Sequence, residues 1–102
     1  MARKYRIELL FSAQKDIDAV VEYFLARNLQ SAAAFLDSLE QTLGRLALYP
    51  QFARISKDKQ LAAEGYRVAL LEYEYLLFYK LQQKTVFVYR VIDGRRNYGA
   101  FI

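Results

Sequence analysis

Apolar and charged residues alternate at the start of the chain. Across Tyr5–Phe11, the apolar residues Ile7 and Leu9 alternate with Arg6 and Glu8. A period of two residues places the apolar side chains on one face of an extended segment. The pattern therefore predicts a half-buried opening strand.

Apolar residues then recur every three or four positions, which is the spacing of one face of a helix. Over residues 13–27 this stripe runs from Ile17 to Phe24. Ser12 stands where an N-cap is expected, and Asp16 follows near the first turn, where the helix dipole favours acidic side chains. We predict an amphipathic helix over residues 13–27.

A second helical stripe of leucines runs from Leu36 to Leu46. Ser31 is its expected N-cap, and Pro50 is its expected stop because proline cannot continue a helix. The link Asn28–Gln30 is short, so the two helices should pack as a hairpin. Both stripes are interpreted as core and not as a cofactor site.

Residues 51–65 follow neither period, and they are predicted to form a mobile loop that ends at Gly65. Three runs rich in Tyr, Phe, Val and Leu come next, as half-buried strands prefer. These runs are Tyr66–Leu71, Tyr75–Leu81 and Thr85–Ile92. Short links at Glu72–Glu74 and Gln82–Lys84 should join neighbouring strands as antiparallel pairs.

The resulting order of elements, β-α-α-β-β-β, predicts an α+β fold. We expect a two-helix hairpin packed on a mostly antiparallel four-stranded sheet. With a length of 102 residues, the chain is expected to form a single domain over residues 1–102.

Cysteine and histidine are both missing from the sequence. Disulfides, a thiol nucleophile, a histidine general base and a histidine-ligated metal are therefore excluded. We expect no metal and no cofactor. Because no long apolar stretch suggests a signal peptide or a membrane span, the sequence predicts a cytoplasmic protein.

The positive charge lies in the second half of the chain. Residues 51–102 hold nine basic and five acidic residues, which accounts for the whole net charge of +4 (9 − 5 = 4). A bias of this kind suits an anionic partner but does not by itself specify one.

Three motifs stand out in the C-terminal half. They are Gly65-Tyr66-Arg67-Val68, Tyr75-Leu76-Leu77-Phe78-Tyr79 and the closing Val88-Tyr89-Arg90-Val91-Ile92-Asp93-Gly94-Arg95-Arg96-Asn97-Tyr98. In their order and spacing, these motifs resemble the RelE/ParE superfamily of toxins. The N-terminal half is similar through its opening strand, the helix start at Phe11 to Tyr23 and the helix end at Leu46–Pro50. Together these segments span nearly the whole chain.

The resemblance implies a growth-inhibiting toxin of a type II toxin–antitoxin pair, neutralised by a small antitoxin protein. It allows two mechanisms. RelE-like members enter the ribosome and cleave mRNA, whereas ParE-like members poison DNA gyrase and have no known hydrolytic site. An exposed apolar strip between the helices and the sheet edge is the expected antitoxin dock.

For an mRNA endonuclease, the resemblance implies Arg67, Arg96 and Tyr98 as catalytic residues. Cleavage would use the 2′-hydroxyl of the RNA as nucleophile, with Arg and Tyr stabilising charge and moving protons. RelE-type nucleases carry a basic residue on the middle strand where this chain has Leu76. The set is therefore incomplete, and we favour gyrase inhibition, with the ribosome-dependent endonuclease as the alternative.

Further basic residues are candidates for binding the target or RNA. They are Arg90, Arg95, Lys57 and Lys59. Each also has a structural interpretation. Arg67 and Arg90 could pair with Glu72, Glu74 or Asp93 across neighbouring strands, while the lysines could simply lie in a solvated loop. A third hypothesis is a structural family member without toxicity.

Overall fold

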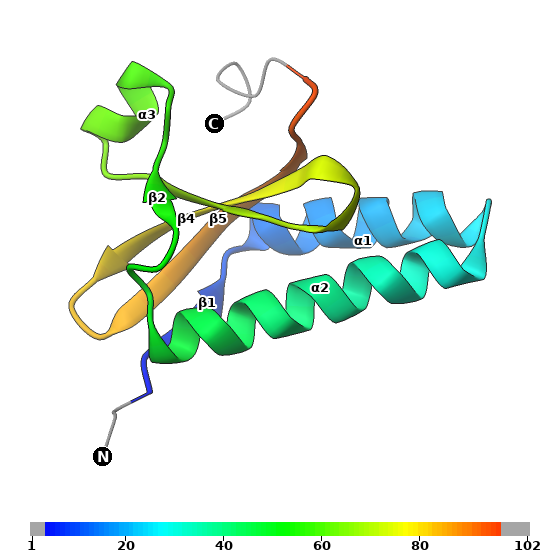
Figure 1. The fold of residues 1–102 in the computed structure, drawn as a ribbon, viewed down its shortest axis with the longest axis horizontal. Helices are drawn as coiled ribbons and strands as arrows, with labels where there is room; N and C mark the ends of the chain where they lie inside the picture. The colour runs from blue at the N-terminus through cyan, green and yellow to red at the C-terminus, as the bar shows by residue number, and fades with distance from the viewer. Residues whose placement is uncertain (1–3, 97–102) are drawn as a thin grey trace.

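The structure is a computed structural model that describes residues 4–96. Its helices and strands follow one another in the order β1 (Arg6–Leu9), α1 (Phe11–Leu25), α2 (Leu29–Leu48), β2 (Arg54–Ile55), α3 (Lys59–Ala63), β3 (Arg67–Leu70), the 3-10 turn η1 (Glu72–Glu74), β4 (Tyr75–Gln82) and β5 (Thr85–Asp93). The predicted α+β fold is confirmed (Figure 1).

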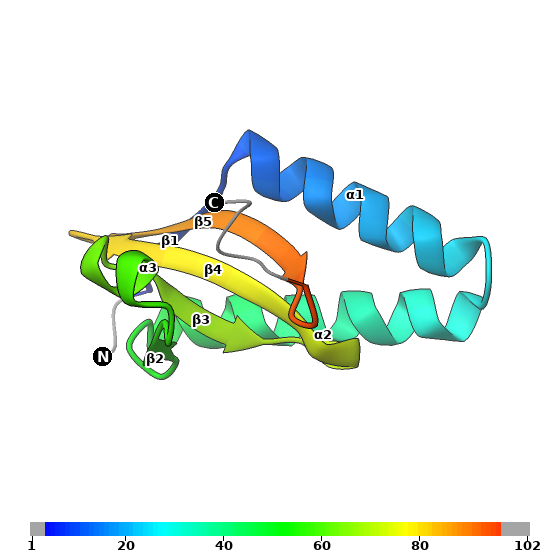
Figure 2. The same ribbon diagram turned by 90° about the horizontal axis from the view of Figure 1, so that it is seen from above.

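The two long helices form the expected hairpin, but both begin earlier than predicted. Leu10, and not Ser12, is the N-cap of α1. Asn28, and not Ser31, caps α2, and its side chain accepts hydrogen bonds from the backbone N–H groups of Gln30 and Ser31. Figures 1 and 2 show that the connection between the helices extends well beyond the end of the sheet.

Within residues 4–96 the sheet has five strands in the order β1-β5-β4-β3-β2, where four were predicted. β1 runs parallel to β5, and the other neighbours are antiparallel. The additional strand is the two-residue edge strand β2, which lies in the segment predicted as a loop. A strand of two residues is too short to show a period in the sequence.

The short helix α3 also lies in the predicted loop. Asp58 is its N-cap, with its carboxylate accepting hydrogen bonds from the backbone N–H groups of Gln60 and Leu61. Gly65 follows with a φ of +89°, a conformation that glycine adopts without strain. The segment is therefore built from a strand, a cap and a helix rather than from an irregular loop.

The core lies mainly between the helix hairpin and one face of the sheet. Phe35, Leu46, Leu77 and Tyr79 are fully buried there. A smaller cluster covers the opposite face, where Leu61 of α3 packs with a second set of sheet side chains. This set consists of Tyr66, Phe78 and Ile92, with Val68, Leu76 and Tyr89 packed against it. Both faces of the central strands are thus covered, as Figure 2 shows for the helix side.

Candidate functional site

The edge of β5 is only half covered by a neighbouring strand. β1 pairs with Thr85–Val88, so on this side, within residues 4–96, no strand continues along Tyr89 to Asp93; β4 lies on the other side. The first turns of α1 cover part of this edge instead. Ser12 Oγ donates a hydrogen bond to the carbonyl of Tyr89 at 2.8 Å, and Asp16 Oδ2 accepts one from the backbone N–H of Val91 at 3.0 Å.

Arg90 forms a forked ion pair with the same aspartate. Its Nε lies 2.6 Å from Asp16 Oδ2, and its Nη2 lies 2.9 Å from Oδ1. The prediction that Arg90 pairs with an acidic residue on a neighbouring strand is therefore wrong, because its carboxylate partner is Asp16 on α1. Both side chains are largely shielded from water, with 25% and 16% of their surfaces exposed. Arg90 therefore links α1 to the sheet. Its guanidinium, which was a candidate for binding the target, is used in this ion pair.

Arg95 pairs with Asp93 just beyond the end of β5. Its Nε and Nη2 lie 2.9 Å and 2.8 Å from the two carboxylate oxygens, and its backbone N–H donates to Oδ1 at 3.0 Å. These hydrogen bonds lower the pKa of Asp93 to about 2. The Arg95 side chain remains 65% exposed, so its outer face is accessible to a partner.

The turn before β4 has a conformation that is uncommon for residues other than glycine. Tyr73 and Glu74 both have positive φ, at 61° and 63°. The turn is held by the backbone N–H of Gly94, which donates to the carbonyl of Glu74 at 2.8 Å. A Cβ at position 94 would lie 2.7 Å from that oxygen, so only glycine fits there without a shift. Strained turns of this kind persist where surrounding contacts hold them in place.

These elements enclose a cleft between α1 and the distal half of β5, with a volume of about 370 Å³. One wall is formed by Ala19, Val20 and Tyr23 of α1. The rest is lined by sheet and tail residues, including Tyr75, Val91, Ile92, Asp93, Arg95 and Arg96. Arg96 makes no ion pair with any residue in the range 4–96. The cleft therefore combines an apolar wall with an exposed basic rim.

Arg67 lies away from this cleft. It is the first residue of β3 and is paired with Tyr79 of β4, whose partner in β5 is Val88. Its Nη1 donates to the carbonyl of Ala53 at 2.7 Å, which fastens the segment before β2. The expected pairing of Arg67 with Glu72, Glu74 or Asp93 is therefore wrong.

The proposed catalytic residues do not converge among the described residues. From Tyr79 to Tyr75, which is opposite Asp93, the separation along the strand is about 13 Å at ~3.3 Å per residue. Arg67 is thus distant from Asp93 and from Arg95 and Arg96, which are hydrogen-bonded to Asp93. Tyr98 lies outside the described residues. Lys57 and Lys59 are exposed at the start of α3, on a different element from Arg95 and Arg96.

The tyrosines of the sheet pack as structural residues. Tyr79 is fully buried, and its hydroxyl donates to the carbonyl of Pro50 at 2.5 Å. Burial raises the pKa of Tyr79 to about 12. Tyr75 packs against Phe35 with ring centroids 5.5 Å apart, and Tyr66 packs edge-on against Tyr89.

A family model for the ParE toxin of type II toxin–antitoxin systems matches residues 7–98. The chain belongs to the ParE toxin family. The resemblance to the RelE/ParE superfamily is thereby confirmed, and so is the assignment as a type II toxin with a ParE-like character. Membership of a toxin–antitoxin family also supports an antitoxin as a partner.

Two solved structures show the same fold. One is described as the chromosomal ParDE toxin–antitoxin system from P. aeruginosa, with a TM-score of 0.71, 15% identity, and coverage of 88% of this chain and 96% of that one. The other is the solution structure of a conserved hypothetical protein from Helicobacter pylori, with a TM-score of 0.58, 23% identity, and coverage of 90% and 97%. No curated protein matches the sequence. No helix within residues 4–96 is long and apolar enough to cross a membrane.

Sequence reasoning missed the role of Asp16 and the contribution of α1 to the cleft. Asp16 was attributed to the helix dipole, yet it lies beyond the first turn and binds β5. Its partner is 74 residues away in sequence, so no local pattern could reveal the pair. Little in the sequence indicates that Tyr23 and Ala19 line the cleft, because they lie outside the apolar stripe of the helix.

Proposed function

We propose that this ParE family toxin inhibits growth by binding DNA gyrase and trapping it on cleaved DNA, and not by cutting mRNA. The supporting observation is the separation of Arg67 from Arg96, the two candidate nuclease residues that the structure describes. Acid–base catalysis needs its groups within hydrogen-bond reach of the same substrate atoms. Arg67 is hydrogen-bonded to Ala53 and lies far from Arg95 and Arg96, so these residues are better suited to binding than to joint catalysis.

Induced expression without the antitoxin tests this proposal. Gyrase-linked DNA breaks and mRNA 5′ ends should be mapped in the same cells. We expect DNA breaks that accumulate while transcripts remain intact. Codon-phased cuts in mRNA would instead support the alternative, a ribosome-dependent endonuclease using Arg67, Arg96 and Tyr98. Absence of toxicity would favour a purely structural family member. Gyrase and the ribosome are both cytoplasmic, and we propose the same location for this protein.

The antitoxin is proposed to occupy the cleft between α1 and β5. The apolar wall at Ala19 and Tyr23 suits an apolar side chain of the antitoxin, and the basic rim at Arg95 and Arg96 suits an acidic one. This arrangement corresponds to the expected apolar strip between the helices and the sheet edge. The antitoxin would thus cover the part of the β5 edge that α1 leaves open.

The substitution Ala19→Glu tests the docking site, because it places a charge on the apolar wall. We expect the antitoxin to lose at least tenfold in affinity, because the added side chain fills the apolar part of the cleft and its carboxylate competes with the antitoxin for Arg95 and Arg96. Ala33→Glu is the matched control, since Ala33 is an exposed alanine on the other helix. Co-purification and rescue of growth by the antitoxin are the readouts. Equal loss for both variants, or none for Ala19→Glu, would contradict this location.

A further inference from the structure

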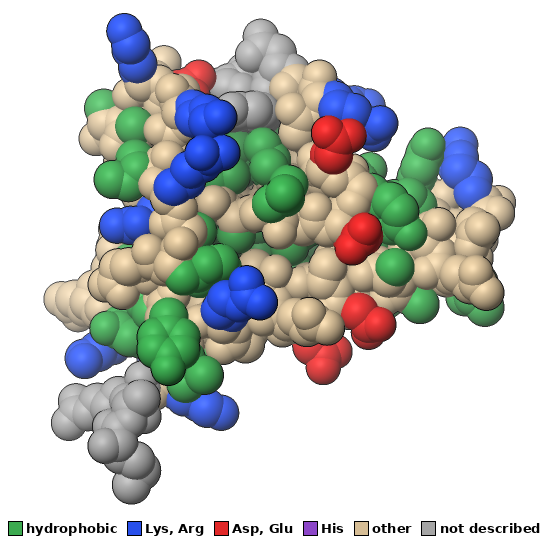
Figure 3. Space-filling model, in the orientation of Figure 1, with side chains coloured by type: hydrophobic (Ala, Val, Ile, Leu, Met, Phe, Trp, Pro, Cys, Tyr) green, Lys and Arg blue, Asp and Glu red, His purple; other side chains and the backbone are tan. Residues whose placement is uncertain are grey.

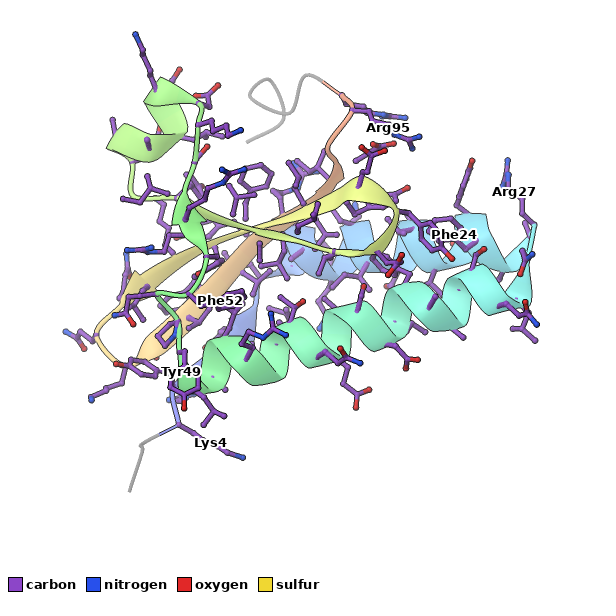
Figure 4. The ribbon with its side chains drawn as sticks, viewed as in Figure 1. Lys4, Phe24, Arg27, Tyr49, Phe52 and Arg95 are labelled. Atoms are coloured by element: carbon purple, nitrogen blue, oxygen red, sulfur yellow. The ribbon has the colours of Figure 1, made fainter. Side chains whose placement is uncertain are left out.

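A second functional surface lies at the end of the molecule where the β4–β5 turn, the N-terminal end of β1 and the C-terminal end of α2 meet. We call it the basic aromatic end and define it by Lys4, Tyr5, Arg45, Tyr49, Phe52 and Lys84. Figure 4 shows Lys4, Tyr49 and Phe52 together at this end, with Arg95 of the cleft far away. The surface is therefore distinct from the proposed antitoxin site.

Backbone contacts hold the segments of this end together. The backbone N–H of Tyr5 donates to the carbonyl of Ala47 at 2.7 Å, which joins β1 to the end of α2. The N–H of Arg6 donates to the carbonyl of Lys84 at 2.9 Å, which joins β1 to the β4–β5 turn. The N–H of Phe52 donates to the carbonyl of Tyr49 at 3.0 Å.

Two side chains of the sheet hold the segment that carries Tyr49 and Phe52. The hydroxyl of Tyr79 holds the carbonyl of Pro50, and the guanidinium of Arg67 holds the carbonyl of Ala53. Pro50 itself is buried. Because both carbonyls are held, the aromatic residues between them are presented on a fixed support. This gives Arg67 a role in positioning the surface.

Aromatic rings at this end are exposed beside cations. Tyr49 is 62% exposed and Phe52 is 42% exposed. The guanidinium of Arg45 lies 5.2 Å from the ring centre of Phe52, and the Lys84 ammonium lies 5.4 Å from that of Tyr5. In Figure 3 a hydrophobic group at the lower left of the view has Lys and Arg side chains around it.

The charge of this end is of one sign. Residues 4–6, 45–55 and 82–85 contain five basic residues and no acidic one. Lys4, Arg45 and Lys84 belong to the surface as defined, and Arg6 and Arg54 lie on the strands β1 and β2 of the same segments; all five are exposed. None of them forms an ion pair within the part of the chain that the structure describes, where the ion pairs join Arg90 to Asp16 and Arg95 to Asp93.

We propose that the basic aromatic end binds single-stranded nucleic acid, with the cations on phosphates and the exposed rings stacked on unpaired bases. A strip of cations without acids matches a regular polyanion, and exposed rings beside cations are what single-strand binding proteins use. An acidic protein would offer charge but no bases to stack. This inference goes beyond gyrase inhibition and does not depend on it.

Fluorescence anisotropy with a labelled oligo(dT) 20-mer tests the proposal on the purified chain of residues 1–102. We expect binding at low salt that weakens as salt rises, and weaker binding of a duplex of the same length. The double variant Arg45→Glu/Lys84→Glu should bind at least tenfold more weakly. The slope of the logarithm of the binding constant against the logarithm of the salt concentration should become shallower by about 1.4. Each single-strand phosphate contact contributes about 0.7 to this slope, and two contacts are removed.

The double variant Lys15→Glu/Arg27→Glu is the matched control, because it makes the same change in net charge on α1 and its C-terminal side. It should retain most of the affinity. The single variants Tyr49→Ser and Phe52→Ala test stacking. Each should weaken binding of oligo(dT) severalfold and leave the circular dichroism spectrum unchanged. No binding, equal loss in the control, or full affinity without the rings would overturn the proposal. Equally tight binding of polyglutamate would also overturn it, in favour of an acidic protein.

Discussion

At the scale of single residues, the conformation of the chain at the end of β5, beside the cleft, is set by a few close contacts. Gly94 allows the chain to approach the carbonyl of Glu74, and Asp93 binds the backbone and side chain of Arg95. These contacts set where Arg95 and Arg96 emerge from β5. The basic rim of the cleft is therefore fixed by its neighbours rather than by the arginines themselves.

The substitution Gly94→Ala should destabilise the fold by about 1–3 kcal/mol, as expected when a methyl group is forced into an occupied space. The added Cβ would lie 2.7 Å from a backbone oxygen and 3.0 Å from Leu76 Cγ. Urea unfolding measures the change. Gly44→Ala is the control, because nothing lies within 4 Å of a Cβ there and the residue is in α2. A loss at position 94 no larger than at position 44 would contradict the close approach.

The pKa of Asp93 predicts a specific dependence of stability on pH. The folded pKa of about 2 lies below the ordinary value of 3.8, so the stabilisation is full above the ordinary value and is lost as pH falls through about 2. Asp93→Asn should therefore be less stable than the wild type at pH 5, and the gap should narrow toward pH 2. Thermal melts across this range measure the gap.

The control for this prediction is Asp37→Asn, at an exposed position on α2. Asp37 forms no ion pair with any residue from 4 to 96. We expect its difference from the wild type to be smaller at pH 5. A constant gap for Asp93→Asn across the range would show that the carboxylate is not stabilised by Arg95.

At the scale of elements, α1 covers the part of the β5 edge that β1 does not pair with, and it hydrogen-bonds to that edge as a further strand would. An unpaired strand edge invites association with other chains, and covering it with a helix is one way to prevent this. Ser12 and Asp16 reach the carbonyl of Tyr89 and the N–H of Val91. The position of α1 over the sheet thus depends on polar contacts as well as on its apolar stripe.

The substitution Asp16→Ala should lower the free energy of unfolding by about 2–4 kcal/mol, because it removes the forked ion pair with Arg90 and the carboxylate that accepts from the backbone N–H of Val91. It should also loosen α1, measured as faster amide exchange at Val91. Asp18→Ala is the control, since Asp18 is exposed on the same helix and surface substitutions change stability little. Equal effects of the two variants would contradict the role of Asp16.

At the scale of the whole molecule, the two proposed surfaces lie at opposite ends of β5. The cleft contains Asp93, the last residue of the strand, and Arg95 beyond it, whereas Lys84 stands just before the first residue of the strand. Acidic side chains gather mostly in the right half of the view in Figure 3, away from the hydrophobic group at the lower left. This separation would allow one partner to be bound at each end.

Separate surfaces predict independent effects. Ala19→Glu should weaken binding of the antitoxin and leave binding of oligo(dT) within about twofold, since distant sites without shared contacts behave additively. Arg45→Glu/Lys84→Glu should do the reverse. Both affinities are measured on each variant. Loss of both activities in either variant would mean that the surfaces overlap.

The sequence by itself determined the helix hairpin, the three C-terminal strands and the toxin family. Each of these is encoded by local periods or by motifs such as Val88–Tyr98, and local periods can be seen without a structure. The two-residue strand β2 and the five-residue helix α3 were not foreseen, because they are too short to show a period. Their turns and caps give only weak local signals.

Tertiary structure alone decided which residues meet. The pairing of Arg90 with Asp16, the contact of Arg67 with Ala53 and the assembly of the basic aromatic end join segments 74, 14 and up to 80 residues apart. Such contacts depend on strand order, on the parallel pairing of β1 with β5 and on where α1 crosses the sheet edge. None of these is specified by a local pattern, because long-range packing fixes them for the chain as a whole.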